Sequence, residues 1–128
     1  MPELVSFDYA IVRVVPRVDR EEFINVGVIL FCRAQRLLDA RVKLDPARLA
    51  ALAPQLDATL VQAQIEQVPL ICAGGAKAGA LGELSQTERF LWLISPRSTT
   101  IQVSPAHSGL CENPRAELDR LFKQAVEC

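Results

Sequence analysis

One histidine and a few arginines, serines and cysteines are the side chains that could carry out chemistry in this chain. His107 is the only histidine, and an imidazole, which ordinarily changes charge near neutral pH, can act as a general base. The nucleophiles that it could activate are Ser98, Ser104, Ser108 and Cys111. The sequence has neither a GxSxG elbow nor a papain-like cysteine context. We therefore favour a structural histidine that bonds backbone carbonyls in a loop rich in Pro, Ser and Gly.

Three arginines are candidate anion ligands. Arg13 lies in the middle of an apolar run, so its guanidinium needs an acidic or carbonyl partner or forms the floor of an anion site, and we favour a core ion pair. Arg97 follows a predicted helix that carries Arg89, and Ser98 adds a hydroxyl. Arginines that converge with a serine suit phosphate or a carboxylate. A small hydrolase or phosphate-handling enzyme that uses Arg97, Ser98 and His107 is thus the alternative function.

The remaining patterns argue against a metal, a cofactor and a nucleic-acid partner. The four cysteines are far apart and the carboxylates are scattered, so no metal site is predicted. The segment 74–82 (GGAKAGALG) lacks the GK[ST] ending of a phosphate-binding loop and follows a helix, so no cofactor is predicted. The net charge of -1 argues against nucleic acid or an anionic membrane surface as the main partner.

The length and the N-terminal residues indicate one domain in the cytoplasm. A chain of 128 residues can bury a sufficient core without disulfides, so we expect a single domain over residues 1–128. Glu3 and Asp8 stand where a secretory signal would have basic residues, and no apolar run reaches the roughly 20 residues that span a bilayer. We therefore expect a cytoplasmic protein with no membrane association.

Apolar patterns predict the strands that must position the candidate residues. Two runs that are apolar on both faces, 7–15 and 25–33, predict central strands. Residues 37–44 alternate apolar and polar side chains, which predicts a hairpin to an outer strand with one wet face. The β-branched segment 98–104 predicts a fourth strand.

The residues between the third and fourth strands predict helices. Asp45 followed by Pro46 marks the start of a short helix. Asp57 caps a longer one, in which Pro69 predicts a kink or an early end. The glycine-rich segment 74–82 predicts a mobile loop.

Two later helices have clearer signals. Ser85 and Glu88 have the spacing of a capping box. The buried stripe predicted after them consists of Phe90, Leu91, Leu93 and Ile94. Asn113 and Pro114 begin a C-terminal helix with an apolar face. The predicted fold class is α+β: a small, mostly antiparallel sheet of about four strands with three to four helices packed on it.

Three segments carry a family resemblance: YAIVRVVPRVDREEFINVGVILFC, ERFLWLISPRSTTIQ and SPAHSGLCENP. They resemble the DUF3037 family, a bacterial family of uncharacterised function, and together they extend over nearly the whole chain. The resemblance implies a gene often encoded beside a HipA-like kinase. It therefore implies an accessory or antitoxin-type role in a two-gene unit.

The resemblance also singles out four positions besides the arginines, Ser98 and His107. Glu22 is expected to pair with a nearby arginine, and Asn25 to close a turn by bonding backbone. Gly27 marks either a bulge or a place where another group comes close. Gly109 belongs to the same motif as His107. We interpret these four positions as structural.

The leading functional prediction is a small partner-binding or accessory protein, without a catalytic set of its own. A HipA-like kinase is the partner that the resemblance suggests. The binding surface is expected at the exposed hairpin face or at the loop from Ser104 to Cys111. A homodimer through the outer strand 37–44 is a further prediction, because an edge strand has accessible backbone groups.

Overall fold

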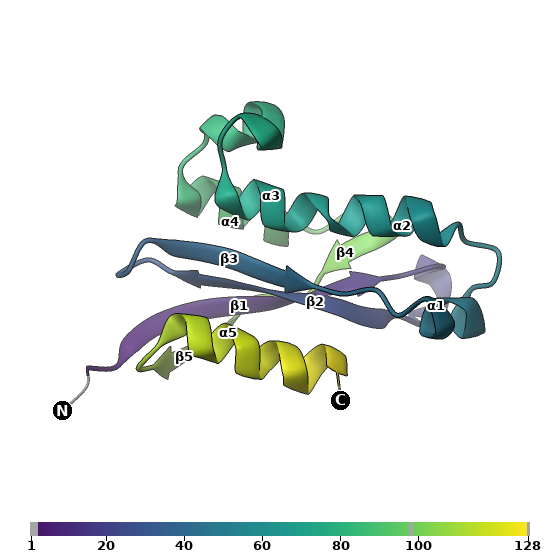
Figure 1. The fold of residues 1–128 in the computed structure, drawn as a ribbon, viewed down its shortest axis with the longest axis horizontal. Helices are drawn as coiled ribbons and strands as arrows, with labels where there is room; N and C mark the ends of the chain where they lie inside the picture. The colour runs from purple at the N-terminus through teal and green to yellow at the C-terminus, as the bar shows by residue number, and fades with distance from the viewer. Residues whose placement is uncertain (1–2, 98, 128) are drawn as a thin grey trace.

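A five-stranded antiparallel sheet lies between two layers of helices in the computed structural model (Figure 1), which describes residues 3–97 and 99–127, Val18 by its backbone alone. The strands are β1 (Val5–Val14), β2 (Ile24–Cys32), β3 (Leu37–Val42), β4 (Ile101–Val103) and β5 (His107–Cys111). The helices are α1 (Pro46–Leu52), α2 (Ala58–Ile65), α3 (Gln67–Ala73), α4 (Gln86–Ile94) and α5 (Pro114–Phe122). Short helical turns form η1 (Val18–Arg20) and η2 (Ala76–Glu83), and η3 (Lys123–Glu127) is π-helical. The α+β prediction is confirmed, with one strand more than expected.

The first three strands form an antiparallel meander in the order β1, β2, β3. Residues 26–32 of β2 are all buried, because helices cover both faces of the sheet at this strand. This burial explains why residues 26–32 form a continuous apolar run in the sequence. β3 forms one edge of the sheet, as predicted for an outer strand.

The opposite edge of the sheet consists of two short strands that both pair with β1. β5 pairs along Val5–Tyr9 and β4 along Val12–Val14. Between them, the backbone N–H of Ile11 donates to Ser104 Oγ at 2.8 Å, and the N–H of Ser104 donates to the Ile11 carbonyl at 2.8 Å. The prediction of a loop around His107 was therefore wrong, since His107 begins β5 and the serine holds the junction to β1.

One helical layer, α2 to α4, covers the first face of the sheet, and α1 lies at one end of the sheet, where its Leu49 joins the core of this layer (Figure 1). α2 and α3 divide at Glu66, three residues before Pro69, which lacks the N–H that would donate to the Ile65 carbonyl in a continuous helix. The predicted capping box of α4 is present between Ser85 and Glu88. The core under this layer includes Val12, Ile29, Ile65, Phe90 and Leu93.

The glycine-rich segment forms a defined turn rather than the loop that we predicted. Residues 76–83 are the 3₁₀ segment η2, and the backbone N–H of Gly75 donates to the Gly82 carbonyl at 3.2 Å. A Cβ on Gly82 would lie 1.9 Å from the Gly75 oxygen. The two glycines thus allow the segment to close on itself.

The other face of the sheet is covered by α5 and η3 (Figure 1). The core on this side includes Phe7, Leu30, Leu118, Leu121 and Phe122. Among the described residues, no helix has the length and apolar character that crossing a membrane would require.

Candidate functional site

Three of the predicted residues, Arg13, Glu22 and Asn25, lie where β1 turns into β2. Arg13 and Asn25 are register partners. The guanidinium carbon of Arg13 lies 4.2 Å from the centroid of the Phe23 ring, and its Nε atom is buried without a hydrogen-bond partner among residues 3–97 and 99–127. A cation–π contact thus stands where we expected an acidic or carbonyl partner.

Asn25 and Glu22 each contact a neighbour of their own. The Asn25 Nδ2 atom donates to the Ala125 carbonyl at 3.3 Å, which ties β2 to the C-terminal helical segment. The Glu22 carboxylate forms an ion pair with Arg20 at the exposed turn. These contacts connect elements or neighbouring side chains, and they give a structural account of both residues.

Both motif glycines in strands lie where another group approaches the backbone. A Cβ on Gly27 would lie 2.7 Å from the Arg41 carbonyl oxygen, and the β1–β2 register shifts nearby, between Val12 and Arg13. A Cβ on Gly109 would lie 2.8 Å from Cζ of the buried Phe7 ring. Gly109 therefore lets the Phe7 ring lie across β5.

Arg89 is buried in the helical layer and is held by main-chain oxygens. Its terminal nitrogens donate to the Leu84 carbonyl and, at 3.3 Å, to the Cys72 carbonyl near the C-terminus of α3. The side chain is 7% exposed, and its guanidinium fits against Gly74, which has a φ of 74°. The C-terminus of a helix carries partial negative charge, so these contacts stabilise a buried cation and tie α3 to α4.

His107 and Arg97 lie on opposite faces of the sheet. The His107 ring stacks on Tyr9, with ring centroids 5.3 Å apart, on the side of the sheet that α5 covers. Arg97 follows α4 on the other side, and its guanidinium carbon lies 4.1 Å from the centroid of the Trp92 ring. Ser98, the third residue of the predicted catalytic set, lies outside the described residues.

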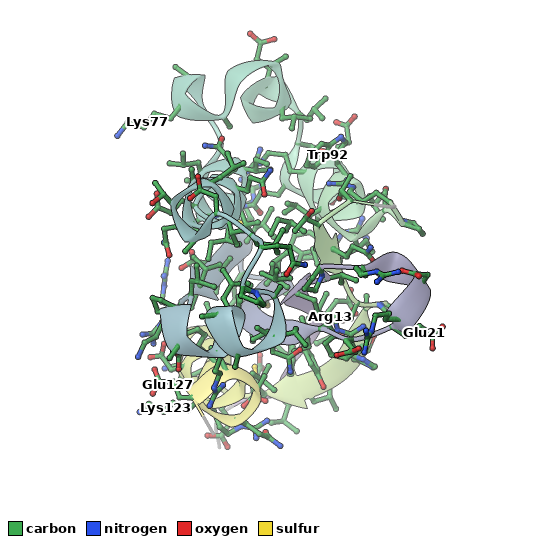
Figure 2. The ribbon with its side chains drawn as sticks, turned by 90° about the vertical axis from the view of Figure 1, so that its right-hand side faces the viewer. Arg13, Glu21, Lys77, Trp92, Lys123 and Glu127 are labelled. Carbon is green, nitrogen blue, oxygen red and sulfur yellow. The ribbon has the colours of Figure 1, made fainter. Side chains whose placement is uncertain are left out.

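Figure 2 shows Arg13 at the level of the sheet and Trp92 in the helical layer above it. Because Arg97 stacks on Trp92, the two arginines are also apart. The four residues whose convergence would make an anion or catalytic site, Arg13, Arg89, Arg97 and His107, are thus held in four separate surroundings.

A groove between α4 and the sheet has no counterpart among the residues predicted from sequence. It has a volume of about 730 Å³, and Phe7, Asp8, Phe31 and Leu91 are among its lining residues. Leu91 is 55% exposed, so its predicted place in the buried stripe of α4 was wrong. A helix position that is apolar but lies off the main stripe was the available signal for this surface.

The β5 strand continues this apolar surface to the edge of the sheet. Leu110 is 65% exposed and is the register partner of Ser6, which lines the groove. Register partners in a sheet point to the same face. Ser108, also on this face, donates to the Asp8 carboxylate at 2.6 Å.

Two of the buried cysteines, Cys72 and Cys111, are poor nucleophiles. Burial raises the pKa of Cys72 to about 12, and burial also raises the pKa of Cys111. Only the thiolate form reacts, so neither thiol is activated at neutral pH. No group of three or more His, Cys, Asp or Glu within the described part of the chain could hold a metal ion.

Of the comparisons with known proteins, one gives a match. No curated protein and no solved structure matches it. The family model described as "Protein of unknown function (DUF3037)" matches residues 9–126, which is nearly the whole chain. This match covers β2, β3 and all five helices, with most of β1 and both strands of the second edge. The chain therefore belongs to the DUF3037 family.

Proposed function

We propose that this protein is a partner-binding accessory module that accepts a strand of another protein at the edge of β5. The observation that carries this proposal is that residues 107–111 include no Lys, Arg, Asp or Glu and lie next to a mainly apolar groove, whose charged lining residues are Asp8 and Arg33. An edge strand exposes backbone donors and acceptors, and charged residues normally protect such edges from pairing.

The groove supplies side-chain specificity to this edge. When a peptide adds a strand to a sheet, backbone hydrogen bonds give affinity, while pockets beside the edge select alternate side chains. Leu110 and Leu91 border the surface that the alternate side chains of an added strand would reach. The expected ligand segment is therefore extended, uncharged and apolar at every second residue.

The proposed partner is the HipA-like kinase that the family resemblance suggests. A binding module needs no catalytic set, which agrees with the separation of His107 from Arg97 by the sheet. In this role the protein would act as an antitoxin-type or regulatory subunit.

The test is complex formation between this protein and a HipA-like kinase encoded beside its gene. The two purified proteins are mixed and the complex is measured by light scattering after size exclusion, and its affinity by calorimetry. Leu110→Lys places a charge at the edge and is expected to weaken binding at least tenfold. Leu60→Lys is the matched control, since Leu60 is 58% exposed on α2 and is not among the residues that line the groove.

Two results would contradict parts of this proposal. Equal affinity of the Leu110→Lys and Leu60→Lys variants would exclude β5 as the docking edge. No complex between the unaltered protein and the kinase at high micromolar concentration would exclude the kinase as the partner. Light scattering of the protein alone shows whether a second copy occupies the edge instead.

A further inference from the structure

A second concave site lies on the other side of α4, between α2, α3 and β4. Its volume is about 300 Å³, near the lower end of the roughly 300–1,000 Å³ that is typical of small-molecule pockets. The lining residues are Gln64, Gln67, Val68, Ile71, Trp92, Leu93, Arg97, Thr99, Thr100, Ile101 and Val103. α4 separates this pocket from the groove, because Leu93 faces the pocket while Leu91 lines the groove.

The pocket combines an apolar interior with a polar border. Val68, Ile71 and Leu93 belong to the buried core, and Ile101 and Val103 pack against it. Gln64, Gln67 and the two threonines bring neutral donors and acceptors to the border. A mostly apolar pocket with a few convergent polar groups is the usual form of a small-molecule site.

Arg97 is the one charged residue among the described lining residues. In the described part of the chain, no carboxylate forms a salt bridge with Arg97. Arg17, Arg41 and Arg115, in contrast, each pair with an aspartate. A guanidinium in a concave, partly apolar site attracts a carboxylate or another planar anion, with which it can form two parallel hydrogen bonds.

The position of the guanidinium is fixed before any ligand binds. Arg97 stacks on the Trp92 ring at 4.1 Å, and its Nη2 atom donates to the Trp92 carbonyl at the end of α4. A guanidinium has five N–H donors, so this arrangement holds the side chain and leaves donors for an anion. A preorganised side chain loses less conformational entropy on binding.

We propose that this pocket binds a small carboxylate with a flat apolar body, with the carboxylate at Arg97 and the body against Trp92 and the floor at Ile101. The site is independent of the protein-binding role of β5. It gives Arg97 a function that requires neither Ser98 nor His107.

The experiment uses phenylpropionate as the probe and its neutral amide as the matched ligand. Trp92 is the only tryptophan in the chain, so its fluorescence reports on this pocket alone. We expect a saturable change of Trp92 emission with phenylpropionate, a matching heat in calorimetry, and at least tenfold weaker binding of the amide. A charge-assisted hydrogen bond is worth roughly tenfold to a hundredfold in affinity.

Two variants test the residues. Arg97→Gln is expected to lower phenylpropionate affinity at least tenfold while leaving amide affinity within about threefold, and Arg115→Gln, on α5, is the control that should change neither. Gln67→Phe, at the exposed border, should block both ligands while Arg97 is retained. Circular dichroism confirms that each variant is folded.

Three outcomes would overturn the proposal. The first is equal affinity for the acid and the amide, and the second is undiminished phenylpropionate binding by Arg97→Gln. The third is the absence of any Trp92 response at millimolar phenylpropionate. None of them bears on the kinase complex, which is measured separately.

Discussion

The two edges of the sheet differ in the charge of their side chains. At the β3 edge, Asp39 forms an ion pair with Arg115, and Arg41 forms one with Asp119, so that side chains of the edge strand are tied to α5. At the other edge, residues 107–111 contain no Lys, Arg, Asp or Glu. Because charge on an edge strand discourages pairing with another chain, this difference supports our proposal that β5, rather than β3, accepts a partner strand.

The largest effect that we expect comes from a substitution that displaces β5 from β1. Gly109→Val places a branched side chain where the Cβ alone would be 2.8 Å from Phe7 Cζ. Overpacking of this kind should lower the free energy of unfolding by about 1–3 kcal/mol, which urea titration measures. Leu110→Val, at the neighbouring position with a side chain that is 65% exposed, is the control. From β-propensity alone, Gly109→Val would stabilise the strand. If the variant is more stable than the unaltered protein, the close approach of Phe7 to Gly109 does not limit the side chain at this position.

The second effect concerns how readily the β5 edge opens. Cys111 is in β5, whereas Cys32 and Cys72 belong to the central strand and to α3. Local opening of a short edge strand needs less free energy than opening of the interior. In a Cys128→Ser background, we expect a thiol reagent to label Cys111 at least tenfold faster than the other two.

Mass spectrometry of labelled peptides over time resolves the three rates. If Cys111 and Cys32 react at the same rate, β5 does not open independently of the sheet. Raising the pH should accelerate the labelling of Cys111, and labelling of Cys72 should stay slower because burial raises the pKa of Cys72 to about 12.

The third effect is a change of the protected edge into an open one. Asp39→Val combined with Arg41→Val removes both ion pairs that tie β3 to α5. Exposed pairs contribute only about 0.2–1 kcal/mol each, so the variant should remain folded. We expect it to self-associate at concentrations where the unaltered protein does not, as measured by light scattering. A variant with unchanged mass would show that charge is not what protects this edge.

The smallest effect concerns the Glu117–Arg120 pair of α5. The hydrogen bond from Arg120 lowers the pKa of the Glu117 carboxyl below its ordinary value of 4.5. The pair therefore stabilises the fold at pH values above 4.5, and this stabilisation is lost as the pH falls through the lowered pKa of Glu117. Glu117→Gln should therefore lower the free energy of unfolding slightly more at pH 7 than at pH 3, as measured by urea titration at both pH values. Equal cost at both values would mean that the charge is immaterial.

Three strands and the helix α4 could be predicted from sequence because their signals are local. Apolar runs defined β1 and β2, alternation defined β3, and the capping box of Ser85 defined α4. β5 could not be predicted, because a segment with Ser108 and Gly109 has weak strand propensity and becomes a strand only by pairing with β1.

The candidate sites depended even more on contacts between distant residues. An arginine at position 13 is unusual in an apolar strand, but nothing in the spacing indicates that Phe23 stacks on it. The Trp92–Arg97 stack could have been suspected from a separation of five residues around the end of a helix. The pocket beside it could not, since Gln64 and Ile101 reach it from elements far apart in the chain.

The pairing of β1 with both β4 and β5 has a consequence for synthesis on the ribosome. β1 is made before both of these partners, so its outer edge is completed only when residues 101–111 have emerged. Until then the nascent meander exposes the edge of β1, which is a site for aggregation or for chaperone binding. Pairing between such distant segments is also intrinsically slow, so the outer edge of β1 stays open until late in synthesis.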